Sequence, residues 1–108
     1  MIKRVSLVRR KPELTREEFV RHWMGPHADI VRQLPGLRGL RFGVVQSWSP
    51  EDAAWDGVGE LWFDDVEGAE RAFATEPHLS RLVADRLLFI GEAQSCFVEE
   101  HTVVPPPG

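Results

Sequence analysis

The chain has 108 residues, with 13 lysines and arginines against 17 aspartates and glutamates, so its formal net charge is −4 at pH 7. This acidic balance, with scattered basic residues, does not match a nucleic-acid-binding surface. The length is that of one domain, and no stretch approaches the roughly 20 apolar residues of a membrane span. Cys96 is the single cysteine, which excludes an internal disulfide and a cysteine metal site. The expected location is cytoplasmic, with no nucleic-acid or membrane partner.

The hydrophobic pattern predicts strand, helix, strand, strand, helix and strand in chain order. The expected strands cover Ile2–Val8, Leu37–Trp48, Val58–Phe63 and Ala93–Val103, with a loop over residues 49–56. This β-α-β-β-α-β order is a split βαβ unit, and it predicts a ferredoxin-like α+β fold with a four-stranded antiparallel sheet. We expect one domain over residues 1–104 and a disordered proline-rich tail over residues 105–108.

The first helix is predicted from Arg16 to Gln33. Thr15 and Glu18 have the spacing of a capping box at its start. Gly25-Pro26 interrupts the pattern, and we expect a kink or break there, with the helix restarting at Pro26.

His27 is the candidate catalytic residue. At about 100° per residue it shares the apolar face with Phe19, Trp23, Ile30 and Leu34. A helix restart at Pro26 would place it beside a positive helix end, where burial and the dipole both favour neutral imidazole, a base near pH 7. A histidine on an apolar face is more often a core residue with one satisfied hydrogen bond, so position alone does not establish the role.

The second helical region has two pieces. Asp64 or Asp65 is expected to cap a helix that ends near Thr75, and Pro77 to start another. The apolar side of this last helix is predicted to carry Leu79, Leu82, Val83 and Leu87.

Both helices of such a unit lie on one face of the sheet. We expect that covered face to carry Val5, Leu7, Leu40, Phe42, Leu61 and Phe63. The opposite face would then show Arg4, Ser6, Val8, Arg41, Val45, Glu60, Trp62, Ser95 and Phe97. Such a face is too apolar to be left to water, so we expect a second copy to stack on it as a homodimer, with room for a small molecule between the sheets.

The candidate substrate-binding residues are Trp23, Arg4, Ser6, Arg41, Glu60, Trp62, Phe97 and His22. Trp23 is more often core than ligand contact. Arg4, Arg41 and Glu60 either form an interface salt bridge or orient a phenolate or carboxylate.

The remaining histidines and the cysteine are expected to be structural or solvated. His22 is expected to be exposed or at a pocket mouth, His78 and His101 at the surface, and Cys96 buried as a small hydrophobe. His22 and His27 are five positions apart, which misses the spacing of a helical metal pair, so no metal is expected.

With order and motifs established, the chain resembles the EthD family of the dimeric α+β barrel superfamily. The resemblance rests on K-R-V-S-L-V-R-R-K-P (Lys3–Pro12), L-T-R-E-E-F (Leu14–Phe19), H-W-M-G-P-H-A (His22–Ala28), L-P-G-L (Leu34–Leu37), E-L-W-F-D (Glu60–Asp64) and F-I-G (Phe89–Gly91). It covers nearly the whole chain, and its most specific part is the Phe-x-x-x-Trp-x-x-x-His-Ala spacing.

The resemblance implies a cofactor-independent enzyme of small metabolites. Family members include a methylmuconolactone methylisomerase and polyketide-tailoring dehydratases and oxygenases, which use a first-helix histidine that matches His27. The methylisomerase has a third-strand cysteine where this chain has Leu61, so that particular reaction is not implied. The expected function is proton abstraction from an aromatic, polyketide- or lactone-type substrate, by an isomerase, a dehydratase or cyclase, or a cofactor-free monooxygenase. The alternatives are a non-catalytic binding or carrier protein and, ranked lower, a haem protein.

Overall fold

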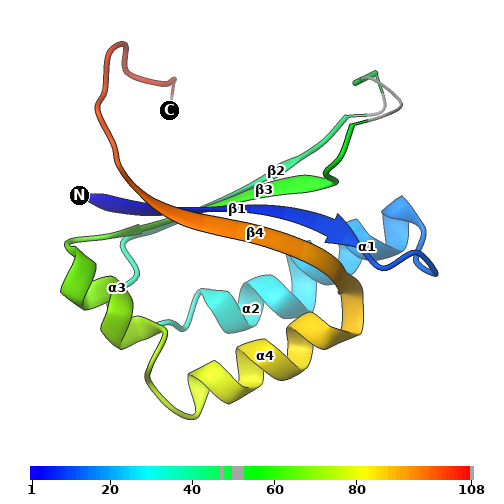
Figure 1. The fold of residues 1–108 in the computed structure, drawn as a ribbon, viewed down its shortest axis with the longest axis horizontal. Coiled ribbons are helices and arrows are strands. Elements are labelled where there is room, and N and C mark those ends of the chain that lie inside the picture. Colours follow the sequence, from blue (N-terminus) through cyan, green and yellow to red (C-terminus); the bar gives the residue numbers. More distant parts are fainter. Residues whose placement is uncertain (47, 50–52, 108) are drawn as a thin grey trace.

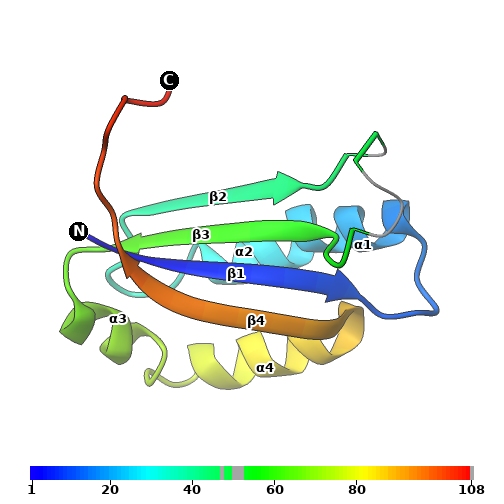
Figure 2. The same ribbon diagram turned by 45° about the horizontal axis from the view of Figure 1, so that its top comes forward.

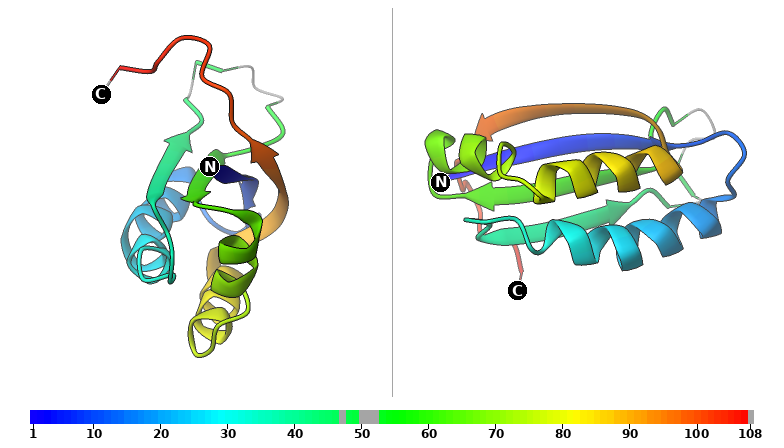
Figure 3. Two further views of the ribbon diagram at one scale, coloured as in Figure 1. Left: turned by 90° about the vertical axis from the view of Figure 1, so that its left-hand side faces the viewer. Right: turned by 90° about the horizontal axis from the view of Figure 1, so that it is seen from below.

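The computed structural model describes residues 1–46, 48–49 and 53–107. In chain order its elements are β1 (Ile2–Arg10), α1 (Arg16–His22), η1 (Trp23–His27), α2 (Ala28–Val31), β2 (Gly39–Val44), β3 (Gly57–Phe63), α3 (Val66–Ala72), α4 (His78–Phe89) and β4 (Ile90–Glu99). The strands form one antiparallel sheet in the order β2-β3-β1-β4 (Figure 2). All helices lie on one side of this sheet (Figure 1; Figure 3). The predicted α+β fold is confirmed.

Some element ends differ from the prediction. β4 begins at Ile90, directly after α4, because Ile90 already pairs with Arg10 in the sheet. β2 ends at Val44, where its pairing with β3 stops at Gly57. Of the predicted loop 49–56, residues 50–52 lie outside the described part. Residues 105–107 of the proline-rich tail are exposed and belong to no strand, and Gly108 also lies outside the described part.

The first helix starts as predicted but does not break. Thr15 Oγ1 accepts a hydrogen bond from the Glu18 N–H, and the Glu18 carboxylate accepts one from the Thr15 N–H, which completes the capping box. At Pro26 the chain forms a π-helical turn, in which the Ala28 N–H donates to the carbonyl of Trp23, five residues back. This wider turn accommodates the missing proline N–H. His27 therefore lies inside a continuous helix, and the expected helix end beside it is wrong.

The predicted faces of β2 and β3 are right, whereas those of β1 and β4 are reversed. Arg4 pairs with Leu61 on one side and with Phe97 on the other, and paired residues share a face. Leu61 is buried under the helices, so Arg4 and Phe97 lie there too. β1 carries apolar residues on both faces, so its alternation alone could not assign the covered one.

The core has two parts, one at each end of the sheet. The buried residues at one end are Val8, Phe19, Trp23 and Phe89. Those at the other end are Val31, Leu34, Leu61, Phe63, Ala69 and Ala72. The buried side of α4 consists of Asp85 and Phe89 with partly buried Leu82, whereas Leu87 is 64% exposed. The expected apolar side of α4 is therefore wrong at Leu87, and also at Val83, which is 50% exposed, because Asp85 occupies part of the buried side.

Candidate functional site

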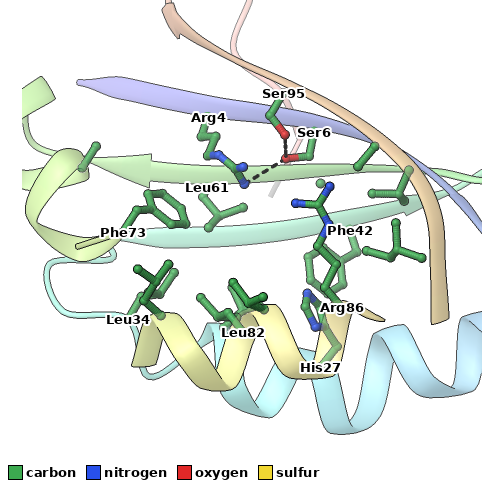
Figure 4. A pocket seen from close by; sticks show the side chains of 18 of the residues that line it. Arg4, Ser6, His27, Leu34, Phe42, Leu61, Phe73, Leu82, Arg86 and Ser95 are labelled. Carbon is green, nitrogen blue, oxygen red and sulfur yellow. Dashed lines mark hydrogen bonds between the residues drawn. The ribbon is translucent and has the colours of Figure 1, made fainter. Parts of the chain in front are cut away.

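A cavity of about 550 Å³ lies between the sheet and the helices of the single chain (Figure 4). It occupies the covered face and not the space between two sheets, where the sequence pattern predicts a ligand. Most of its wall is apolar and aromatic, including Trp23, Leu34, Phe42, Leu61, Phe73, Leu82 and Phe97. A few polar side chains interrupt this wall: Arg4, Ser6, His27, Glu70, Arg86 and Ser95. A largely apolar cavity with a few convergent polar groups is typical of a small-molecule site.

His27 is fixed in the cavity wall by a carboxylate. Its Nδ1 lies 2.8 Å from Oδ2 of Asp85, a buried residue of α4. The second oxygen of Asp85 lies 3.0 Å from Nε2 of His22. Phe89 contacts both rings, with centroid distances of 4.6 Å to His22 and 4.9 Å to His27. One carboxylate thus holds two imidazoles, one of which lines the cavity.

The hydrogen bonds and burial define the state of the His27 ring. A carboxylate only accepts, so Nδ1 carries a proton and donates to Asp85. In the neutral ring Nε2 is then the unprotonated nitrogen. Burial lowers the pKa of His27 below its ordinary value; Asp85 opposes this shift, while His22 and Arg86 add to it. The side chain is 12% exposed, which agrees with burial as the largest cause. Burial, one of the two expected causes, therefore favours the neutral ring of His27, whereas the expected helix end is not there to contribute.

Two arginines enter the cavity from opposite walls. The Arg4 guanidinium, from β1, donates to Ser6 Oγ at 3.1 Å and lies 4.6 Å from the centroid of the Phe73 ring. The Ser6 hydroxyl is in turn 2.9 Å from that of Ser95. Arg86 follows Asp85 on α4 and projects toward the sheet (Figure 4). Burial and the charge of Arg86 lower the pKa of Arg4. This part of the wall is therefore polar and positively charged.

The cavity brings together most of the residues expected to contact a ligand and separates the others. It contains Trp23, His27, Arg4, Ser6 and Phe97. Arg41, Glu60 and Trp62 are not among its lining residues, because they lie on the opposite face of the sheet. His22 is half-buried, outside the lining, and bonded to Asp85, so the expected exposed or pocket-mouth position is wrong. Trp23 is core as well as cavity wall, since it is 2% exposed and stacks on Phe42.

Sequence reasoning misses Asp85 and Arg86. Asp85 follows Leu82 by three positions and precedes Phe89 by four, so it falls on the buried stripe of α4. A carboxylate at such a position needs a buried partner, which is the available signal. The partner cannot be named from the sequence, because α1 and α4 meet only in the folded chain.

The other single residues lie as follows. His101 is exposed as expected. His78 is half-buried, and its Nε2 is shielded from water without a hydrogen-bond partner among the described residues, so its expected surface position is wrong. Cys96 is exposed on β4, opposite Val5, and the expected burial is also wrong. Cys96 lies on the face away from the helices because the two faces of β4 are the opposite of those predicted.

The uncovered face of the sheet mixes charge with aromatic surface. Lys3 Nζ lies 2.7 Å from Glu60 and 2.8 Å from Glu100, and Trp62 Nε1 donates to Glu100 at 2.9 Å. Lys3 and Arg41 both stack on the Trp62 ring. Within the chain Glu60 pairs with Lys3, whereas Arg4 lies on the covered face of the sheet, beside Leu61.

Over the described ranges, no set of three histidine, cysteine or acidic side chains is placed to hold a metal ion. Asp85 uses both oxygens on imidazole nitrogens. In the same ranges, none of the helices has the length and apolar character needed to cross a membrane.

The fold defines a ferredoxin-like α+β domain, with a largely apolar cavity between its sheet and its helices. More particularly, the chain belongs to the EthD family, because residues 11–93 match the EthD domain. An EthD family protein from Bacillus halodurans C-125 has a similar structure, with a TM-score of 0.77 and 24% identity over 94% of this chain and 99% of that one.

Two further structures share the fold. A dimeric ferredoxin-like protein of unknown function from Thermobifida fusca YX has a TM-score of 0.70 and 16% identity, covering 90% of this chain and 88% of that chain. SnoaB from Streptomyces nogalater, a cofactor-independent oxygenase solved as a mutant, has a TM-score of 0.64 and 16% identity over 97% of each chain.

A curated relative is much longer than this chain. GTPase Der from Bifidobacterium longum is 27% identical over 84 residues, which are 78% of this chain but 18% of that protein. This chain has no G-x-x-x-x-G-K-[S/T] phosphate-binding motif.

Proposed function

We propose that this protein is a cofactor-independent enzyme in which neutral His27 abstracts a proton next to a carbonyl of a small aromatic, polyketide- or lactone-type metabolite. The observation that carries the proposal is the 2.8 Å hydrogen bond from His27 Nδ1 to buried Asp85, in a ring that lines the cavity. SnoaB, a protein of the same fold, is a cofactor-independent oxygenase, which supports this class of chemistry.

The proposed step is a general-base reaction. Nε2 of His27 takes a proton from the carbon beside the carbonyl, and the electron pair of the broken C–H bond moves to the carbonyl oxygen as an enolate. The imidazolium so formed donates from Nδ1 to Asp85, whose carboxylate stabilises the new positive charge. Isomerisation, dehydration, cyclisation and oxygenation can each begin from such an enolate.

The test is hydrogen–deuterium exchange at an acidic carbon. Anthrone and an alkyl-substituted butenolide, incubated with the protein in D2O at pH 7, report proton abstraction as loss of a proton NMR signal. We expect His27→Asn to slow the protein-dependent exchange about 10²–10⁴-fold. His101→Asn is the matched control, because His101 is exposed, pairs with nearby Glu99 and is not among the cavity-lining residues.

A carrier protein would give the opposite result. It would bind the same compounds without exchange, and His27→Asn would bind them equally well. A haem protein would show a Soret band on purification. Exchange that persists at full rate in His27→Asn would refute the assignment of the base.

We also infer that the chain forms a homodimer through the uncovered face of its sheet. That face carries partly buried Val5, Leu7 and Trp62, and no helix covers it in Figure 1. The Thermobifida fusca protein of the same fold is dimeric, and a second copy stacked sheet on sheet would bury this surface symmetrically. A mass of 12.3 kDa at micromolar concentration, that of one chain, would refute the inference.

A further inference from the structure

Arg4 places a charged side chain in the cavity wall, which the binding of a neutral ligand would not require. It is half-buried on the covered face of the sheet, between the Phe73 ring and the Ser6 hydroxyl. Placing a guanidinium under helices costs solvation free energy, which is recovered only by partners of its own. Ser6 Oγ satisfies one of several guanidinium N–H donors, so Arg4 retains donors for another group.

Carboxylates near this charge are engaged elsewhere or too far away. Within the described part of the chain, neither Arg4 nor Arg86 has a carboxylate oxygen within 4.0 Å. Glu70 also lines the cavity, but the ion pairs found among the described residues join it to neither arginine. Asp85 accepts hydrogen bonds from two imidazoles. Most other arginines on β1 and α1 differ: Arg9 pairs with Glu92, and Arg10 and Arg16 with Asp56.

The second guanidinium extends the same positive region toward the base. Arg86 stands on α4 next to Asp85, and its charge lowers the pKa of Arg4 on the sheet as well as that of His27 on the helix. Arg86 is therefore within electrostatic reach of both side chains. It is exposed and also lines the cavity, so its guanidinium is accessible to a ligand there.

We propose that Arg4 and Arg86 form an anion subsite, and that the physiological ligand is an apolar planar molecule bearing a carboxylate. A carboxylate has two oxygens that accept from the fork of an arginine, and it would neutralise the repulsion between the two guanidinium groups. The ring system would fill the apolar remainder of the cavity, lined by Leu34, Leu61, Phe73 and Leu82 (Figure 4). This inference deepens the proposed function, on which it rests, by naming the substrate class.

The test measures binding and not turnover. The probes are 2-naphthoate, which is ionised at pH 7.5 because ordinary carboxyl pKa values are near 4, and 2-naphthamide, its neutral isostere. Isothermal titration should give a dissociation constant for naphthoate about 10-fold or more below that for naphthamide. Arg4→Met and Arg86→Met should each reduce this preference, and the naphthoate preference of the wild type should weaken as salt rises.

Arg9→Met is the matched control. Arg9 is also a β1 arginine, so this variant changes the net charge equally, but its guanidinium pairs with Glu92 outside the cavity lining. The naphthoate preference should survive in this variant. Equal dissociation constants for the two probes in the wild type, or no measurable naphthoate binding, would overturn the proposal even if Arg4→Met failed to fold. A preference unchanged in both Arg4→Met and Arg86→Met would also overturn it.

His27→Asn separates this inference from the proposed function. It should bind naphthoate with the same preference as the wild type, because the anion subsite does not include the base. If His27→Asn kept both the naphthoate preference and the full rate of proton exchange, the assignment of His27 as the base would be refuted and the anion subsite would stand. If His27→Asn lost the proton exchange but the wild type showed no preference for naphthoate, the anion subsite would be refuted and the assignment of the base would stand.

Discussion

Replacing Asp85 by asparagine tests whether this carboxylate holds the two imidazoles in place. Asp85 accepts hydrogen bonds at 2.8 and 3.0 Å, and its side chain is 10% exposed. A hydrogen bond to a charged group contributes about 1.5–3 kcal/mol. An asparagine amide has one acceptor oxygen, so one imidazole N–H would lose its partner or the ring would have to change tautomer. We expect Asp85→Asn to lower the free energy of unfolding by about 2–4 kcal/mol.

The measurement is urea unfolding followed by tryptophan fluorescence at pH 7.5 and fixed protein concentration, because stability of a dimer depends on concentration. Asp29→Asn is the control, since the side chain of Asp29 is 70% exposed. A double-mutant cycle with His27→Asn should give a coupling energy of about 1 kcal/mol or more. A loss below about 0.5 kcal/mol in Asp85→Asn, or no coupling to His27, would refute the reasoning, because surface substitutions have effects of that size.

Three further predictions follow from the fold. Burial lowers the pKa of folded His27, so the unfolded state binds more protons at pH values between the folded pKa and about 6.5. The free energy of unfolding should therefore fall as the pH drops through this range. His27→Asn should remove this pH dependence, and an NMR titration giving a ring pKa at or above about 6.5 would contradict the prediction. Trp62→Glu should convert the expected dimer to a 12.3 kDa monomer in light scattering, because it places charge on the uncovered face; a persistent dimer would show that another surface associates. Deleting residues 105–108 should leave the unfolding midpoint unchanged, since residues 105–107 are exposed and belong to no strand; a large drop would show that the tail packs on a partner.

The sequence is sufficient for features that depend on neighbouring residues. The capping box of Thr15 and Glu18 and the strand and helix order follow from local spacing, and both are confirmed. The position of His27 beside Trp23 on the inner side of the first helix follows from helical periodicity, which the π-helical turn does not disturb enough to move the ring out of the cavity wall.

Features that depend on distant contacts cannot be predicted in the same way. The covered face of β1 is determined by its partners Leu61 and Phe97, because β1 itself is apolar on both sides. The alternation of β1 therefore puts Arg4 on the wrong side of the sheet, although Arg4 is rightly a candidate ligand-binding residue. The pairing of Asp85 with His27 joins residues 58 positions apart, and nothing in the sequence around either residue points to the other.

Gly57 of β3 lies close to the ring of Trp23, which forms part of the cavity wall. A Cβ added to Gly57 would lie 2.3 and 2.5 Å from two carbons of the Trp23 ring. The ring cannot yield easily, because it is 2% exposed and stacks on Phe42 with a centroid distance of 4.4 Å. Overpacking of this kind costs about 1–3 kcal/mol, so Gly57→Ala should lower the unfolding midpoint by several degrees.

Gly59 provides the matched control for this prediction. It lies two residues along the same strand on the same buried face, and an added Cβ would meet Phe42 at 3.7 Å and Ser6 at 3.8 Å, which are ordinary contacts. Gly59→Ala should therefore unfold close to the wild-type midpoint, while near-ultraviolet circular dichroism should show a changed tryptophan environment in Gly57→Ala alone. If the two variants lose equal stability, the cost comes from replacing glycine in a buried strand. The contact between Gly57 and Trp23 would then not be what shapes this end of the cavity.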